Sequence, residues 1–240
     1  MSERVVELEV LRYNPETDSE PRFQRYSVAC RDEWVVLDAL NHVKETIDPT
    51  LSYRWSCHMA VCGSCGMMVN REPKLACKAF LRDYQGVIRV EPLAHFPIER
   101  DLVTVIDDFM DKLKRVRPYL IPKQERPVSE GEYRQTPAEL KKFKQYSMCI
   151  NCMLCYAACP EYGLIPKYIG RRRSRWRTAT TRIRATADAT SASRRSRRPR
   201  ARGNARSSAP APRSVPSTWI RRAPFSRSRS RVWWTGTRST

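Results

Sequence analysis

Cysteine is the residue of this chain whose spacing most clearly implies chemistry, because eight of its nine cysteines fall in two tight groups. The first group reads Cys57-x4-Cys62-x2-Cys65, with Cys77 following after eleven residues. This is the plant-type spacing of 2Fe–2S ligands. Each iron of such a cluster is tetrahedral and shares two sulfides with its neighbour, so the protein must supply two thiolates per iron. The spacing predicts that these four cysteines hold a 2Fe–2S cluster.

A zinc site is the alternative for four cysteines. Structural zinc sites usually pair two short Cys-x2-Cys hooks, whereas three of these cysteines share one loop that carries Gly63 and Gly66. The two glycines suit a backbone that folds closely around the sulfides and offers N–H groups to them. Cys30 lies outside the spacing and is predicted to be a buried core thiol. His58 is predicted to be a surface residue, because a Rieske site would need two histidines.

The second group, Cys149-x2-Cys152-x2-Cys155-x3-Cys159-Pro160, is the bacterial ferredoxin run. In that run the first three cysteines serve one cluster and the fourth serves another. A partner set is therefore required elsewhere, yet no cysteine follows Cys159. The chain as written offers three ligands for one cluster and one for a second.

The elements around the first group are predicted from hydrophobic periodicity. Alternation indicates strands at Val5–Val10 and Phe23–Val28, helical spacing indicates a helix over Val35–Ile47, and a short strand is expected at Val87–Val90. This order predicts an α+β fold. It corresponds to an N-terminal plant-type ferredoxin domain of the β-grasp type, over residues 1–105.

Proline marks the expected domain boundary, at Pro92 and Pro97. Beyond it, an amphipathic helix is predicted to open at Glu99 and run to about Lys114, and a second helical segment over Pro137–Tyr146 leads into the second cysteine group. Residues 106–170 are therefore expected to form a helical, bacterial-ferredoxin-like domain that is incomplete.

Arginine dominates the end of the chain. Residues 171–240 hold 21 arginines, no lysine and one acidic residue, so they carry the whole net charge of +20, and residues 1–170 are neutral. Arg, Ser, Thr, Ala and Pro make up 57 of these 70 residues without an apolar period, which predicts a disordered basic tail. Arginine runs with Trp219, Trp233 and Trp234 leave nonspecific nucleic-acid binding as an alternative function.

The N-terminus, Met1-Ser2-Glu3-Arg4, lacks the layout of a signal peptide. The sequence also has no apolar run of the roughly 20 residues that a membrane span needs. We therefore expect a cytoplasmic protein whose membrane contact is made through partners. In a reducing cytosol, tight cysteine groups are better explained as metal ligands than as disulfides.

Four segments resemble the iron–sulfur subunit of fumarate reductase and succinate dehydrogenase. They are Arg54-Trp55-Ser56-Cys57, Cys62-Gly63-Ser64-Cys65-Gly66-Met67, Pro73-Lys74-Leu75-Ala76-Cys77 and Cys149-Ile150-Asn151-Cys152. The resemblance covers residues 5–170. Asn151 and the segment Tyr156-Ala157-Ala158 are more similar to the fumarate reductase branch.

The resemblance implies a row of 2Fe–2S, 4Fe–4S and 3Fe–4S clusters between an FAD-containing flavoprotein subunit and membrane anchor subunits. Single electrons would pass between the flavoprotein, where fumarate and succinate interconvert, and a membrane quinone. Cys149, Cys152 and Cys155 would share the 4Fe–4S cluster with a tail cysteine, and Cys159 would join two others on the 3Fe–4S cluster. It also implies a peripheral location on the cytoplasmic face of the inner membrane, no catalytic residue on this chain and no specific nucleic acid.

The missing ligands should lie where the arginine-rich tail stands, and the genetic code offers a test. When the reading frame moves back by one nucleotide, Val215–Ser226 permits Cys-Pro-Lys-His-Val-Asp-Pro-Ala-Gly-Ala-Ile-Gln, which resembles the family's C-terminal region. Cysteines are recovered at the positions of Ala205, Ala211 and Val215. We infer a frameshift just after Gly170. A stand-alone 2Fe–2S carrier without a flavoprotein partner remains the other alternative.

Overall fold

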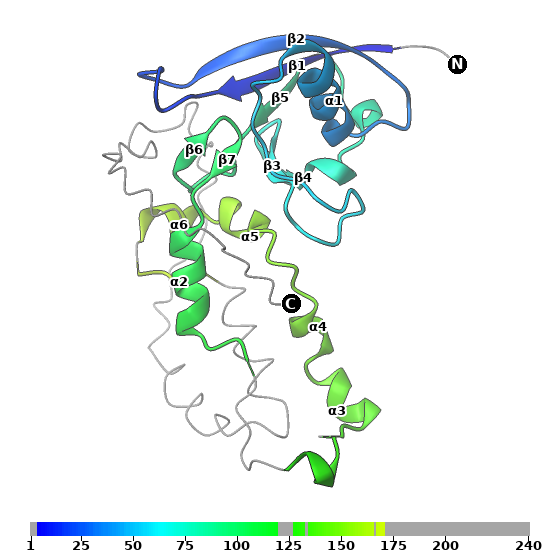
Figure 1. Ribbon diagram of the computed structural model, residues 1–240, viewed down its shortest axis with the longest axis vertical. Coiled ribbons are helices and arrows are strands. Elements are labelled where there is room, and N and C mark those ends of the chain that lie inside the picture. Colours follow the sequence, from blue (N-terminus) through cyan, green and yellow to red (C-terminus); the bar gives the residue numbers. More distant parts are fainter. Residues whose placement is uncertain (1–3, 120–126, 133, 166, 171–240) are drawn as a thin grey trace, which may run out of the picture.

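The computed structural model describes residues 4–119, 127–132, 134–165 and 167–170. The predicted disordered tail, residues 171–240, lies outside the described residues. A five-stranded mixed sheet forms the upper half of the molecule in Figure 1, and short helices lie below it. This combination confirms the predicted α+β class.

The sheet has the strand order β2-β1-β5-β3-β4. β1 pairs antiparallel with β2 over its whole length, and it pairs parallel with β5, with Leu8 opposite Ile88. β3 pairs antiparallel with both β5 and β4. The bounds of the five strands are β1 Arg4–Arg12, β2 Arg22–Cys30, β3 Gly66–Val69, β4 Glu72–Leu75 and β5 Ile88–Glu91.

Alternating apolar residues explain how this sheet acquires a core. Val6, Leu8 and Val10 of β1 are buried, and the residues between them face outward. Helix α1 (Val36–His42) continues as the π-helical turn η1 (Val43–Ile47), and its apolar residues join the same core. The Asp38 side chain accepts a hydrogen bond from the Val35 N–H at 2.9 Å and so caps the helix start. The strands and helix predicted from periodicity are thus confirmed.

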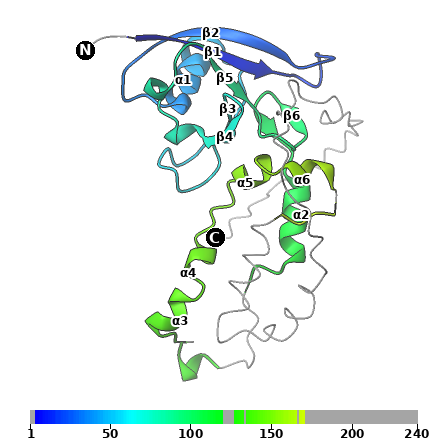
Figure 2. The same ribbon diagram turned by 180° about the vertical axis from the view of Figure 1, so that it is seen from behind.

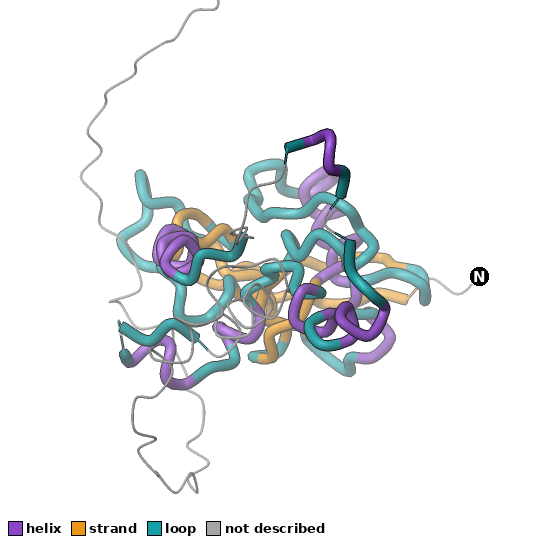
Figure 3. The backbone as a smooth tube through the Cα atoms, turned by 90° about the horizontal axis from the view of Figure 1, so that it is seen from below, coloured by secondary structure: helices purple, strands orange, loops and turns teal. Residues whose placement is uncertain are grey.

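Short elements make up the rest of the described chain, and loops fill much of the trace between them (Figure 3). Helices α3 and α4 extend away from the sheet, whereas α2, α5 and α6 lie next to it (Figures 1 and 2). The remaining elements are η2 Ala76–Lys78, η3 Leu81–Asp83, β6 Ile98–Arg100, β7 Val103–Thr104, α2 Asp107–Arg115, η4 Val128–Glu130, α3 Pro137–Lys141, α4 Lys144–Ser147, α5 Leu154–Ala157 and α6 Pro160–Leu164.

Two predicted helices differ from the structure. The helix predicted from Glu99 begins only at Asp107, because the chain first forms the β6–β7 hairpin, whose turn places Asp101 at a φ of 45° and buries its carboxylate. The helix predicted over Pro137–Tyr146 is divided into α3 and α4 at Lys142 and Phe143.

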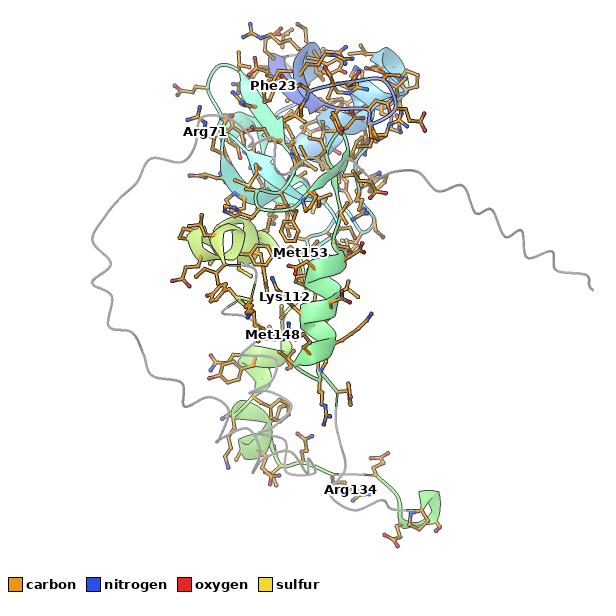
Figure 4. All side chains as sticks on the ribbon, turned by 90° about the vertical axis from the view of Figure 1, so that its left-hand side faces the viewer. Phe23, Arg71, Lys112, Arg134, Met148 and Met153 are labelled. Carbon is orange, nitrogen blue, oxygen red and sulfur yellow. The ribbon has the colours of Figure 1, made fainter. Side chains whose placement is uncertain are left out.

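A second apolar core joins the sheet to the helices below it. Its buried members include Leu93 and Phe96, just after β5, together with Phe109 of α2 and the aromatic rings of Tyr156 and Tyr162. The Tyr156 and Tyr162 rings meet edge to face at 4.6 Å between centroids. In Figure 4, Met153 and Lys112 lie at this junction, while Phe23 lies on the sheet above it. The core thus fixes the second cysteine segment against the sheet.

Candidate metal centres

The first cysteine group is assembled by a loop and a hairpin. Cys57, Cys62 and Cys65 lie on the loop between η1 and β3, and Cys77 lies in η2 directly after β4. The β3–β4 pairing sets Gly66 opposite Leu75, and the Ala76 N–H donates to the Cys65 carbonyl at 3.0 Å. The hairpin therefore returns the chain so that Cys77 meets Cys65, although eleven residues separate them.

The four sulfurs lie as two pairs. The backbone N–H of Cys62 donates to Cys57 Sγ at 3.3 Å, and that of Cys57 donates to Cys62 Sγ at 3.5 Å. Cys65 and Cys77 are electrostatic neighbours, because both the backbone and the thiol of Cys77 influence the Cys65 thiol. Within the described residues, no three His, Cys, Asp or Glu side chains form a site for one metal ion. Two thiolates at each of two points are the donor set that a binuclear cluster requires, so these residues fit a 2Fe–2S cluster.

Backbone amides of the loop are directed at the sulfurs. The N–H of Met59 donates to Cys57 Sγ at 3.4 Å, and that of Ser64 donates to Cys62 Sγ at 3.5 Å. These contacts are possible because His58, Ala60 and Gly63 all have positive φ angles. Such donors stabilise negative charge on sulfur.

The thiols of this group differ in their acidity. Donation from the side chain and backbone of Ser64, with donation from Cys57, lowers the pKa of Cys62 to about 6. Burial raises the pKa of Cys65 to about 11, against an opposing contribution from the backbone N–H of Cys77. The half-buried Cys62 and the buried Cys65 thus lie in different electrostatic environments.

Cys30 is buried and His58 is at the surface, as predicted. Cys30 is 3% exposed at the end of β2, inside the sheet core, and burial raises the pKa of its thiol. His58 is exposed, and its Nε2 lies 2.8 Å from the Asp38 carboxylate of α1.

A cavity of about 390 Å³ marks the second cysteine group. Cys149, Cys152 and Cys155 line it, together with Ala60 from the first cysteine loop and Phe109 from α2. The chain around them is tightly turned, with φ angles of 55° at Asn151 and 62° at Met153. Three cysteines that line one cavity fit part of the ligand set of a 4Fe–4S cluster. The lining by Ala60 and Phe109 was not foreseen from the sequence, because it depends on tertiary packing.

Cys159 is set apart from that cavity. It occupies the position before α6 and packs against the second core beside Tyr156 and Tyr162. Cys159 is not among the residues that line the cavity with the first three cysteines of the run, although Cys155 packs on the same core.

Arg12 binds the segment that leads into the first cysteine loop, and this role was not predicted from the sequence. The buried guanidinium donates to Asp101 Oδ1 at 3.0 Å and to Thr50 Oγ1 at 2.7 Å, and it forms a further ion pair with Asp48. Asp101 also accepts the backbone N–H of Ser52 at 2.9 Å. One cation thus ties β1 and the β6–β7 turn to residues 48–52, the segment that enters the cysteine loop.

Asp48 is strongly influenced by these contacts. Burial alone would raise its pKa, but hydrogen bonds from Thr50, Tyr26 and Arg12 outweigh that effect and hold the pKa of the carboxyl well below its usual range. The Tyr26 hydroxyl donates to Asp48 Oδ2 at 2.8 Å, and burial with this contact raises the pKa of Tyr26 to about 12. At neutral pH Asp48 is therefore ionised, while Tyr26 keeps the proton that it donates to the Asp48 carboxylate.

None of the helices within the described ranges combines the length and the apolar character needed to cross a bilayer.

Known proteins resemble both the sequence and the fold. The 2Fe-2S iron-sulfur cluster binding domain family matches residues 7–111. A fumarate reductase iron-sulfur subunit of Mycobacterium tuberculosis is 58% identical over 171 residues, 71% of this chain and 69% of the relative, and one of Haemophilus influenzae is 53% identical over 69% of each. A succinate dehydrogenase iron-sulfur subunit of Paracoccus denitrificans is 37% identical over 64% of this chain and 59% of the relative. The solved Mycobacterium smegmatis Sdh1 complex in the apo form contains a similar chain, with a TM-score of 0.69, 28% identity and 77% of each chain covered.

Proposed function

The chain belongs to the fumarate reductase and succinate dehydrogenase iron–sulfur subunit family, and we propose that Cys57, Cys62, Cys65 and Cys77 hold the 2Fe–2S cluster through which it transfers electrons. The observation that carries this assignment is the arrangement of the four sulfurs as two pairs. The subunit is the electron-transfer part of an oxidoreductase complex, and a bound 2Fe–2S cluster supplies the ability to take up and release one electron at a time.

The residues around the cysteines set the conditions for that transfer. The Met59 and Ser64 amides donate to the outer pair of sulfurs and favour added negative charge there. Cys65 and Cys77 are buried against the sheet, which excludes water from the inner pair. Hydrogen bonds to sulfur and exposure to solvent are two of the means by which a protein adjusts the potential of such a site.

Identity favours the fumarate reductase branch. The fumarate reductase relatives are 53–58% identical to this chain, against 37–38% for the succinate dehydrogenase relatives. We propose that the partners are an FAD-containing flavoprotein subunit, membrane anchor subunits and a quinone at the anchor interface. The complex would then lie on the cytoplasmic face of the inner membrane.

We propose that Cys149, Cys152 and Cys155 are ligands of a 4Fe–4S cluster and Cys159 of a 3Fe–4S cluster, in a helical domain over residues 106–170 that follows the ferredoxin domain over residues 1–105. Their partner cysteines would be encoded in the shifted frame after Gly170. The matched share of this chain supports this, since 71% is as large as the part that precedes Arg171. Resequencing the coding DNA around Gly170 tests this proposal. A one-base insertion or deletion near that codon should open a reading frame that encodes the partner cysteines. The absence of such a frame in the DNA would refute the proposal.

Iron and sulfide analysis with electron paramagnetic resonance tests the 2Fe–2S assignment. The full chain, reconstituted with iron and sulfide, should show one 2Fe–2S signal after reduction. Cys57→Ser and Cys77→Ser should each abolish the native signal, because each removes one thiolate from a different pair. Cys30→Ser is the matched control, a cysteine buried in the same domain, and should keep it. A colourless chain that binds zinc instead would overturn the proposal.

A further inference from the structure

The two cysteine groups touch through glycine backbone. A Cβ built on Gly63 would lie 2.9 Å from Cys152 Cβ and 2.9 Å from the Ile150 carbonyl oxygen. A Cβ built on Gly66 would lie 2.9 Å from the Cys152 carbonyl oxygen and 3.4 Å from Leu154 Cδ2. Real Cβ atoms essentially never approach so closely, so any side chain at either position would push the second cysteine segment away.

Space is the property that the two glycines share. Gly63 has a φ of 75°, which by itself favours glycine, but Gly66 lies in strand β3 and is not among the residues with positive φ. At Gly66 the lack of a side chain therefore serves only the close approach of residues 150–154. The glycines flank the ligands directly, since Gly63 follows Cys62 and Gly66 follows Cys65.

Further contacts join the first cysteine loop and its hairpin to the second cysteine segment. Ala60, also on the first loop, lines the cavity that holds the second group's three cysteines. Leu93, which follows β5, lies 3.5 Å from the Cβ position of Gly66 and belongs to the buried second core. The α5 segment is in contact with β4 of the ligand hairpin.

We propose that Gly63 and Gly66 are positioning residues that seat the segment Ile150–Leu154 directly on the first cysteine loop, so that Cys152 closes the gap between the two centres. The inference rests on the proposed function, because it concerns transfer between the two proposed ligand sets. A single van der Waals contact separates a cysteine of the second set from the backbone that joins Cys62 to Cys65. The seated segment also covers Gly63, which is buried.

Three glycine substitutions separate the effect of lost space from that of backbone strain, and a fourth substitution, at Leu154, tests the contact from the other segment. Gly66→Ala adds only a clash, whereas Gly63→Ala adds a clash and an unfavourable φ. Gly86→Ala is the matched control, because Gly86 has nearly the same φ as Gly63, 72°, with nothing within 4 Å of its Cβ position. Leu154→Ala removes a contact from the opposite side and leaves the first loop's sequence unchanged.

Hydrogen exchange reports whether the segment remains seated. The amides of Tyr156, Ala157 and Ala158 donate to carbonyls at Met153 and Leu154, so their exchange follows the opening of this turn. In the full chain carrying its 2Fe–2S cluster, Gly66→Ala, Gly63→Ala and Leu154→Ala should speed their exchange by about tenfold. Gly86→Ala should leave it unchanged.

The midpoint potential of the 2Fe–2S cluster is the second measurement. Moving the segment away admits water and removes two carbonyl oxygens, and both changes favour the more negative reduced state. Gly63→Ala, Gly66→Ala and Leu154→Ala should therefore each raise the midpoint potential, and Gly86→Ala should leave it unchanged. Unchanged exchange and potential in Gly66→Ala and Leu154→Ala would overturn the inference, whereas a wild-type chain that holds no 2Fe–2S cluster would overturn the proposed function instead.

Discussion

Replacing Arg12 with methionine should unfold the ferredoxin half far more readily than any exposed substitution. The Arg12 side chain is 8% exposed. The side chains of its two carboxylate partners, Asp101 and Asp48, are 2% and 16% exposed. Arg12→Met keeps the length and apolar stem of the side chain but leaves both carboxylates without their cation.

Removing one partner of a buried pair costs about 3–5 kcal/mol, because the remaining charge stays buried and uncompensated. Asp101 keeps the backbone N–H groups of Tyr13 and Ser52, so we expect a loss near 3 kcal/mol. For a domain of this size, each kcal/mol lowers Tm by roughly 4–8 °C, which corresponds to a fall of about 12–24 °C. Arg12→Lys should lose less, since it keeps the charge but not the fork that reaches several acceptors.

Thermal unfolding of the 2Fe–2S-loaded chain measures this, with the visible circular dichroism of the cluster as the signal. Arg25→Met is the matched control, because Arg25 lies on the neighbouring strand and pairs with Glu9 at 3.2 Å, but 68% of its side chain is exposed. That pair should contribute no more than about 1 kcal/mol. If Arg12→Met and Arg25→Met lowered Tm equally, the buried network would not anchor the cysteine loop.

Two further outcomes follow from the same structure. Because the folded pKa of Asp48 lies below its unfolded value, its charge contributes stability that is complete above about pH 4 and is lost as pH falls through the folded pKa. The difference in unfolding free energy between wild type and Asp48→Asn, measured in urea, should therefore be constant from about pH 5 to 7 and shrink below about pH 4. A constant difference at all pH values would contradict this. Gly170→Ala should speed hydrogen exchange around Tyr156 without loss of the 2Fe–2S signal, because Gly170 has a φ of 87° and its Cβ would lie 2.5 Å from the Tyr156 ring; unchanged exchange would refute it.

Local patterns determine what could be predicted from the sequence. β1, β2 and α1 carry clear two- and 3.6-residue periods, and the ligand spacing identifies the first cysteine group. β3 and β4 were missed because each has only four residues, and β4 contains Pro73.

The remaining features depend on contacts between distant residues. The prediction of a helix from Glu99 was wrong because Asp101 lies in a turn and binds Arg12, 89 residues away in the chain. The pairing of Cys65 with Cys77 depends on the β3–β4 hairpin, and the wall of the second cavity includes Ala60 from another loop. Periodicity reports only which face of an element is apolar and cannot show these meetings.

The parallel pairing of β1 with β5 also governs the order in which a growing chain can finish its sheet. β1 is translated before its parallel neighbour, β5, which is complete only at Glu91, after Cys77 has been translated. Because domains assemble as the polypeptide emerges from its N-terminal end, every thiol of the first set is available to the assembly machinery while the centre of the sheet is still open. The four cysteines of this set are therefore all in place before the sheet can close beside them.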